Sequence, residues 1–389
     1  MVIPHFPTLN VFNFFKKSQP VDRLPFPLNN QRSVFYYLAR NAVNAAIEVL
    51  NLRAGDEILM PAYNSGVEYQ PFVKKGIVIK YYDLAKDLSV PLESLRTLIS
   101  NKTKALYLIH MWGFVAANFQ EVLEFSKFHN LYLIEDCALS FLSSYHNKYL
   151  GSFGDVSIFS LRKSLPIPNG GVLVVNNEKL ALPRRPEPPK SFYSTLIELG
   201  SLIMENWSLR FSFWVPVRDL LRWLFRRILQ PRLQKIGVEK VSAGILAFDE
   251  AKANWGMSQI SEFVIRRLNY SEIISRRRQN YEHLVQMINK AMPDIKLLLA
   301  PLVEGTVPLF LPVLVKNNHQ VVTHLQQAGI GAGLWWQDFP FLKEENSYPT
   351  LVYLKKHLVE IPIYQDLEEK EILFIFRTIQ EWHTATITS

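Results

Sequence analysis

Two periodicities of apolar and polar residues, one typical of helices and one of strands, alternate over the first half of the chain. From Ser33, apolar residues recur at helical spacing, which predicts a helix that ends near Ala54–Gly55. Short apolar runs typical of buried strands follow: DEILMPAY, GIVIKYYDL, KALYLIH, LYLIED, Val156 to Ser160 and Val172 to Val175. Helical patterns at residues 92–99 and 119–129 lie between the first of these runs. Strands that alternate with helices imply right-handed crossovers, so we expect an α/β fold with a mostly parallel sheet.

The alternation of strand and helix patterns ends at PRRPEPP, residues 183–189. The pattern after this segment differs, which indicates further parts of the chain. An unusual helical segment then runs to about Lys240. A long helical pattern extends from Met257 to about Met287, and a strand pattern (TVPLFLPVLV) and helices at 319–328 and 371–382 complete the chain. We therefore expect an irregular N-terminal arm (1–30), a large domain (31–250) with a helical insertion at about 183–240, and a smaller α/β domain (251–389).

Composition narrows the classes of protein that this chain can represent. It has 389 residues, of which 48% are hydrophobic and 20% charged, as in ordinary globular proteins. The single cysteine, Cys137, cannot form a disulfide within the chain, and no pattern of a signal peptide or membrane span is seen, so a cytoplasmic protein is expected. Eight lysines and arginines but only three acids lie between Glu205 and Lys240, so five of the eight net positive charges are local. A concentrated charge of this kind argues against a globally basic nucleic-acid-binding protein.

The basic segment at residues 205–235 has two interpretations. Its apolar residues form one helical stripe: Val217, Leu220, Leu221, Leu224 and Ile228. Arg218, Arg222 and Arg226 lie on another face. One interpretation is an interfacial helix at a membrane surface with anionic lipid, which would make the protein peripheral at the inner membrane. The other, which we favour at this stage, is that the stripe packs on its own domain or a partner subunit and the arginines bind substrate phosphates.

Polar residues of complementary chemistry follow several of the predicted strands. Asp136 ends one strand and Ser160 another, and Lys163 comes just after Ser160 in a loop with two prolines and two glycines. Because ligands gather at the carboxyl ends of parallel strands, these side chains are expected to meet there. A lysine for a Schiff base and a carboxylate for a pyridine nitrogen indicate pyridoxal 5′-phosphate (PLP). His110 also ends a strand, but we interpret it, like Cys137, as a structural residue, and no metal site is predicted.

The phosphate of such a cofactor needs hydrogen-bond donors near the start of a helix. Arg40 and Asn41 begin the stretch AVNAAIEVL, and the hydroxyl of Ser160 is close by in the predicted sheet. These three residues are the candidates for binding phosphate.

Several motifs occur in an order that resembles the DegT/DnrJ/StrS family of PLP-dependent sugar aminotransferases: AGDEILMPAY, HMWG, IEDCALSF, GSFGDVSIFSLRKSLPIPNGG and NWGMSQI. The resemblance implies an aspartate-aminotransferase-like fold with a large domain and a smaller C-terminal domain. It implies that Lys163 forms the Schiff base, that Asp136 partners the ring nitrogen, and that Arg40, Asn41 and Ser160 hold the phosphate. It also implies that Asn254 reaches the phosphate of a neighbouring subunit, which makes the protein a homodimer with shared sites.

Three positions depart from the family's pattern. Leu139 stands where the family usually has Gln or His beside the cofactor's phenolic oxygen. Asn64 or Ser65 stands where an aromatic residue usually stacks on the ring, with Tyr63 nearby. The sequence PIYQ, ending at Gln365, replaces a motif that contains histidine.

The resemblance implies transfer of an amino group from an amino acid, with glutamate expected, to a keto sugar linked to a nucleotide, in polysaccharide or natural-product biosynthesis. Related sugar dehydratases carry His in place of the lysine, so Lys163 favours transamination. The alternative function is a PLP-fold protein that binds cofactor or ligand and has lost turnover through changes such as Leu139, and that docks on a membrane through residues 205–235.

Overall fold

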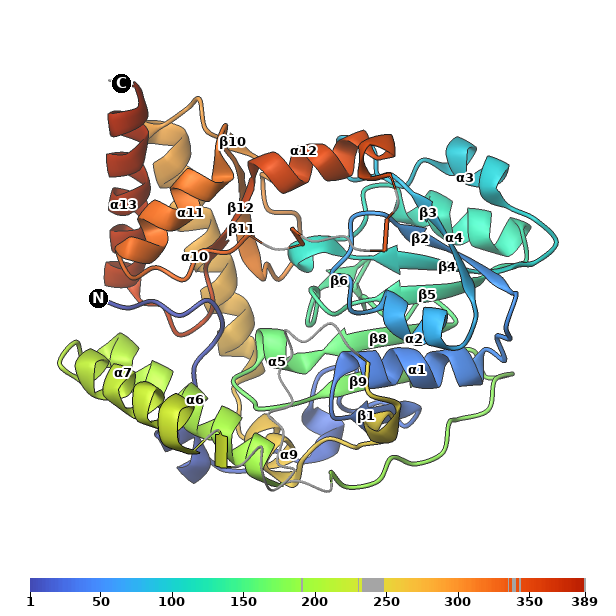
Figure 1. The fold of residues 1–389 in the computed structure, drawn as a ribbon, viewed down its shortest axis with the longest axis horizontal. Coiled ribbons are helices and arrows are strands. Elements are labelled where there is room, and N and C mark those ends of the chain that lie inside the picture. The colour runs from blue at the N-terminus through green and yellow to red at the C-terminus, as the bar shows by residue number, and fades with distance from the viewer. Residues whose placement is uncertain are drawn as a thin grey trace.

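A seven-stranded sheet organises the larger part of the computed structural model, which describes residues 1–189, 192–229, 231–232, 248–334, 336–337, 341–342 and 344–387 (Figure 1). The strands are β1 (Ser33–Tyr36), β2 (Glu57–Pro61), β3 (Val78–Tyr82), β4 (Thr103–Ile109), β5 (Tyr132–Asp136), β8 (Val156–Ser160) and β9 (Gly171–Val175). Their order is β1-β9-β8-β5-β4-β2-β3, and β9 runs opposite in direction to the other six strands. The predicted α/β architecture with a mostly parallel sheet is therefore confirmed.

Helices connect these strands: α1 (Ala39–Val49), α2 (Tyr69–Lys74), α3 (Leu92–Leu98), α4 (Phe119–Phe128) and the single-turn α5 (Leu161–Ser164). The prediction of a helix from Ser33 was wrong at both ends. Residues 33–36 form the edge strand β1, because they pair in register with β9, from Ser33 opposite Val174 to Tyr36 opposite Gly171. The helix begins only at Ala39 and ends at Val49. Long-range pairing has here overridden a local helical period.

The C-terminal part contains a second, antiparallel sheet in the order β10-β11-β12. Its strands are β10 (Lys296–Leu297), β11 (Phe310–Leu314) and β12 (Leu358–Pro362), and its helices are α9 (Gln259–Ile265), α10 (Tyr270–Ala291), α11 (Asn318–Gln327), α12 (Pro349–His357) and α13 (Glu369–Ile387). The single long helix predicted from Met257 is interrupted, because the Asn269 side chain accepts a hydrogen bond from the Glu272 backbone N–H and starts α10 anew. The domain boundary near residue 250 stays a prediction.

The N-terminal arm lies against this second sheet and beside α13 (Figure 1). The backbone N–H of Ile3 donates to Gly329 and its carbonyl accepts from Gly331. Further along, the Thr8 backbone N–H donates to the carboxylate of Asp366 at 2.9 Å. Hydrogen bonds thus hold the N-terminal arm against the C-terminal part of the chain.

A helical hairpin, α6 (Phe192–Arg210) and α7 (Trp214–Leu224), stands at one side of the molecule (Figure 1). The π-helical turn Phe225–Leu229 extends α7. Residues 190–191, 230 and 233–240 of the predicted insertion lie outside the described residues. Among the described residues, no helix combines the length and the apolar character needed to cross a bilayer.

Four of the five residues of the apolar stripe on α7 and its extension are exposed in the described chain: Val217, Leu220, Leu221 and Ile228 are 37%, 57%, 41% and 43% exposed. The stripe therefore does not pack on its own domain, and the alternative that it packs on a partner subunit stays a prediction. Two of the three arginines that were expected to bind substrate phosphates are engaged within the hairpin, while Arg226 is exposed. Arg218 and Arg222 both pair with Glu205 of α6.

Candidate active site

A cavity of about 650 Å³ opens where the carboxyl ends of β4, β5 and β8 meet the start of α1. Parallel strands that end at the same edge place their terminal side chains together. The predicted site residues that line the cavity are Arg40, Ser65, Asp136, Leu139, Ser160 and Lys163. Segments far away in the sequence also line it: Phe6 of the arm, Glu198 of α6, and Leu334 and Trp336.

Asp136 is the last residue of β5 and is 6% exposed. Its carboxylate accepts a hydrogen bond from the Tyr107 hydroxyl at 2.6 Å and another from the Ala138 backbone N–H at 2.8 Å. Burial, together with the negative charge of Glu68, raises the pKa of Asp136 to about 6, although both hydrogen bonds and the nearby Lys163 oppose the shift. The carboxylate is therefore fixed in orientation and titrates close to neutral pH.

Lys163 lies on α5, directly after β8, and lines the same cavity. Burial lowers the pKa of Lys163, while the charges of Asp136, Glu68 and Glu360 raise it in part. The loop that follows is held by β9, where Gly171 approaches the backbone of Leu38 so closely that a methyl group would collide with it. This close approach fixes the lysine segment against the start of α1.

Two cations gather at the start of α1. Arg40 is 8% exposed, and burial lowers its pKa, with the neighbouring Arg162 acting in the same direction. Arg162 also lines the cavity, where the charge of Glu198 partly offsets the effect of burial. Together with Ser160, these guanidinium groups give one corner of the cavity the chemistry of an anion site.

The three predicted asparagines do not line the cavity. The Asn41 amide donates to the carbonyl oxygens of Lys252 at 2.5 Å and Ala253 at 3.0 Å. The Asn64 amide donates to the Pro61 carbonyl at 2.8 Å and closes the turn after β2. Asn254 is half-buried in the segment that Asn41 holds, and its predicted contact with a second subunit stays a prediction.

Sequence analysis missed two acids near Lys163. Glu68 is 7% exposed, lines the cavity and accepts hydrogen bonds from the backbone and hydroxyl of Ser65. Glu360, on β12, is 1% exposed and accepts a hydrogen bond from the Trp112 indole, while its other oxygen has no hydrogen-bond partner among the described residues. Burial raises the pKa of Glu360 to about 8, and Trp112 and Lys163 oppose the shift. Burial thus favours the protonated form of Glu360.

An aromatic wall also escaped prediction, because its members come from separate segments. Trp336 lines the cavity, and its ring packs edge-on against Tyr63 with centroids 4.7 Å apart. Tyr63 in turn lies 6.4 Å from Trp112. Leu139, which is 1% exposed, adds an aliphatic side chain to the lining.

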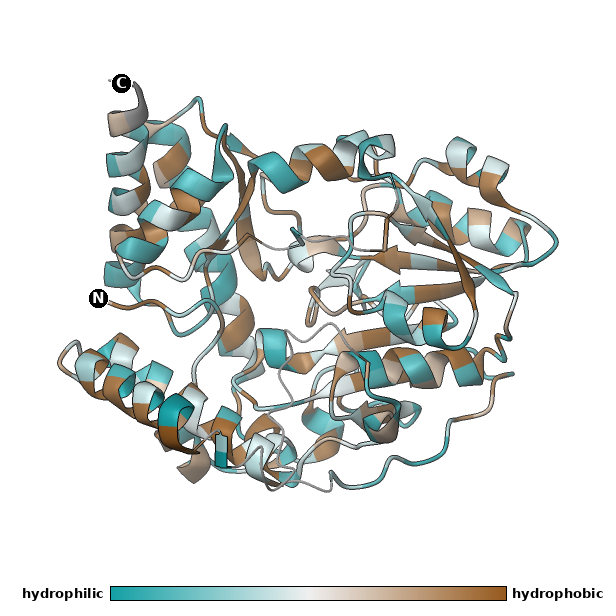
Figure 2. Ribbon diagram, viewed as in Figure 1, coloured by the Kyte–Doolittle hydropathy of each residue, from teal (hydrophilic) through white to brown (hydrophobic). Residues whose placement is uncertain are grey.

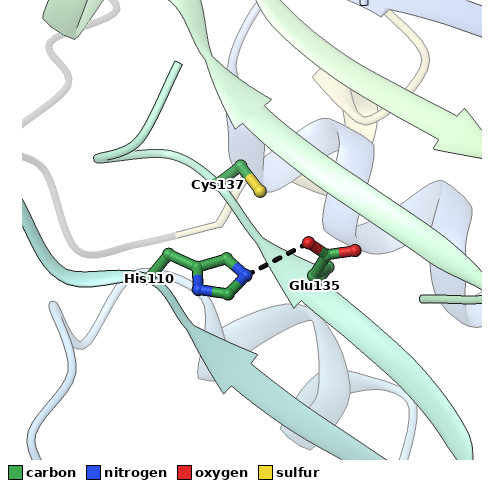
Figure 3. A group of neighbouring side chains, drawn as sticks. All are labelled: His110, Glu135 and Cys137. Atoms are coloured by element: carbon green, nitrogen blue, oxygen red, sulfur yellow. Dashed lines mark hydrogen bonds and ion pairs between the residues drawn. The ribbon is translucent and has the colours of Figure 1, made fainter. Parts of the chain in front are cut away.

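A second cluster, formed by His110, Glu135 and Cys137, is structural (Figure 3). The potential ligand atoms lie within 4.8 Å of one another, but His110 Nδ1 accepts from the Ala116 backbone at 3.2 Å and its Nε2 donates to Glu135 at 3.1 Å. The Glu135 carboxylate also accepts three backbone N–H groups, from Gly151, Phe153 and Gly154. The atoms of His110 and Glu135 that could bind a metal are already engaged in fixing the 151–154 turn to β5.

Comparison with known proteins shows which family part of this chain resembles. Residues 38–185 match the DegT/DnrJ/EryC1/StrS aminotransferase family. GDP-perosamine synthase of Escherichia coli O157:H7 is 31% identical over 142 residues, which cover 36% of this chain and 39% of that enzyme. The match thus spans about two fifths of that relative's length.

Solved structures extend the likeness to the whole chain. The aminotransferase TlmJ of Streptoalloteichus hindustanus superposes with a TM-score of 0.66 at 16% identity, covering 100% of both chains. The E. coli GDP-4-keto-6-deoxy-D-mannose-3-dehydratase, solved with hydrated PLP, gives 0.61 at 18% identity, covering 89% of this chain and 87% of that chain. At this identity the likeness establishes the fold, and it confirms the predicted fold class.

Proposed function

We propose that the protein is a PLP-dependent sugar aminotransferase of the DegT/DnrJ/EryC1/StrS family, whose model matches residues 38–185. It would move an amino group from an amino acid, with glutamate as the expected donor, to a keto sugar carried on a nucleotide. The observation that supports this most strongly is the convergence of Lys163, Asp136 and an arginine-lined corner on one cavity.

The chemistry of the lining fits PLP. An amine and a buried carboxylate share the cavity with a basic corner suited to phosphate. When bound, PLP supplies an electron sink that makes the hydrogen next to the amino group acidic. Lys163 would hold the cofactor and, once released, move a proton at its Nζ, a role that its lowered pKa supports because a base must be neutral to accept a proton.

Asp136 would face the ring nitrogen. The two hydrogen bonds from Tyr107 and Ala138 fix its carboxylate, and a protonated ring nitrogen would favour the ionised form of this acid. Arg40, Ser160 and the first N–H groups of α1 would bind the phosphate, with Arg162 as an additional cation. Asn41 and Asn64 would act indirectly, by fixing the backbone around the site.

Trp336 would supply the aromatic surface that the PAYNSG stretch lacks. Its ring lines the cavity and is braced by Tyr63. Leu334, Phe6 and Glu198 complete the side of the cavity on which a sugar would enter.

We propose a cytoplasmic homodimer in which Asn254 contacts the cofactor phosphate of the partner subunit. Light scattering of the purified protein should then give twice the chain mass of 45.1 kDa. A monomer that binds PLP tightly would contradict this assembly.

Single-turnover kinetics test the activity. Mixing the PLP-loaded protein with glutamate or other amino acids should bleach the cofactor's visible absorbance, and Lys163→Ala should abolish the bleaching. The ligand-binding alternative rests on Leu139, which cannot donate a hydrogen bond to the cofactor. If no amino acid bleaches the absorbance, and Leu139→Gln does not restore bleaching, the protein is a PLP-fold ligand-binding protein and not an aminotransferase.

A further inference from the structure

The helix α7 is amphipathic, but its two faces are turned opposite to those of an ordinary surface helix, whose apolar stripe faces the core. Its arginine face points inward: Arg218 is 8% exposed, and both Arg218 and Arg222 pair with Glu205 of α6. Its apolar face points outward, and the exposed side chains on it and on its π-helical extension are Phe213, Val217, Leu220, Leu221, Trp223 and Ile228. Figure 2 shows the hairpin at the edge of the molecule, with hydrophobic and hydrophilic residues interspersed along its helices.

This arrangement leaves a strip of large apolar side chains in water. Phe213 is 71% exposed, Leu220 57% and Trp223 53%. Exposing contiguous apolar surface of this kind to water is unfavourable in free energy unless a membrane or another molecule covers it. The inward ion pairs with Glu205 hold the helix in this orientation, so the exposure is built into the hairpin.

Positive charge accompanies the apolar strip. Arg226, Arg227 and Arg232 are exposed, and no Asp or Glu occurs between residues 220 and 238. The Arg227 guanidinium lies 5.7 Å from the centre of the Trp223 ring, so cation and aromatic group share one edge of the strip. Exposed Trp, Leu and Phe beside arginines is the composition of a helix that lies in the interfacial region of an anionic membrane.

We propose that the α6–α7 hairpin docks the protein on an anionic lipid surface, with the apolar face of α7 inserted among the acyl chains and Arg226, Arg227 and Arg232 facing the headgroups. A second copy of the chain fits this surface less well. A two-fold contact between identical patches would bring these arginines toward their own copies, and Asp219, the acid on α7, already pairs with Arg218. Anionic headgroups supply the missing negative charge.

Vesicle co-sedimentation of the full-length, PLP-loaded protein tests the proposal. The probes are phosphatidylcholine vesicles with and without one third phosphatidylglycerol, at low and high salt. We expect binding to the anionic vesicles that weakens with salt. Arg226→Gln with Arg227→Gln should weaken it roughly 30-fold, because each basic residue near such a surface contributes about a factor of five. Leu220→Gln with Leu221→Gln should weaken it by at least roughly tenfold.

The matched control is Phe128→Gln on α4, since Phe128 is 80% exposed but lies on another helix. It should bind vesicles like the wild type, and the cofactor's visible absorbance in each variant reports whether the fold is intact. Failure of the wild type to bind anionic vesicles would overturn the proposal. So would an oligomer larger than the dimer that Leu220→Gln with Leu221→Gln dissociates, because a second copy would then be the occupant.

Discussion

Replacing Glu360 by Gln should stabilise the protein increasingly as the pH rises from about 4.5 to about 8. The carboxyl of Glu360 is 1% exposed, and burial raises its pKa from 4.5 to about 8. Gln resembles the protonated acid in shape and can still accept the hydrogen bond from the Trp112 indole. The substitution therefore removes a titratable group while it keeps the packing and the hydrogen bond from the Trp112 indole.

The size and sign of the effect follow from linkage. An acid whose pKa is higher in the folded than in the unfolded chain binds more protons when folded, so stability falls as pH rises from about 4.5 to about 8. Between pH 6 and pH 8 the free energy of unfolding of the wild type should fall by about 2 kcal/mol relative to Glu360→Gln. Below pH 4 the two proteins should differ little, because Glu360 is protonated in both states of the wild type.

Urea unfolding of both proteins at a series of pH values measures this difference. Glu381→Gln, a change at an exposed carboxylate on α13, is the control and should show no such pH-dependent gap. A constant difference between wild type and Glu360→Gln across pH 6 to 8 would refute the conclusion that burial favours the protonated form of Glu360.

Three further outcomes are expected. In Asp136→Asn, PLP affinity measured by equilibrium dialysis should fall roughly 10- to 100-fold, as expected when a charge-assisted hydrogen bond is lost; in the wild type it should weaken as pH drops below about 6, where Asp136 becomes protonated, and a pH-independent wild-type affinity would contradict this. Leu139→Gln should leave the single-turnover rate equal or up to roughly fivefold faster, because one hydrogen bond to the cofactor contributes about 1 kcal/mol; a slower rate would show that the aliphatic side chain is needed. Gly171→Ala should lower both the melting temperature and the PLP affinity, because the added methyl group collides with the Leu38 backbone. If neither quantity changes, the backbone around Leu38 can move to accommodate the methyl group.

Much of the candidate site was predictable because its residues follow individual strands closely in the sequence. Asp136, Ser160 and Lys163 follow strands whose apolar runs are short and clearly bounded, and parallel pairing then brings their ends together. Arg162, beside Lys163, was visible as part of a basic pair, and only its burial in the cavity required the structure.

The remainder depends on long-range contacts. Glu360 is a single acid in the apolar run VEIPI, and nothing in the sequence indicates that β12 brings it close to Lys163. The strand β1 continues the helical period of α1, and only its pairing with β9 distinguishes it. The break before α10 did have a local signal, since Asn269 followed by Glu272 is a typical capping pattern.

The identity of the lysine that carries the cofactor is the central claim, and borohydride reduction followed by peptide mapping tests it most directly. Reduction of the PLP-loaded protein should leave a pyridoxyl group on the peptide that contains Lys163, and Lys163→Ala should take up none. A pyridoxyl group on any other lysine of the wild type, or none at all in protein saturated with PLP, would contradict the account.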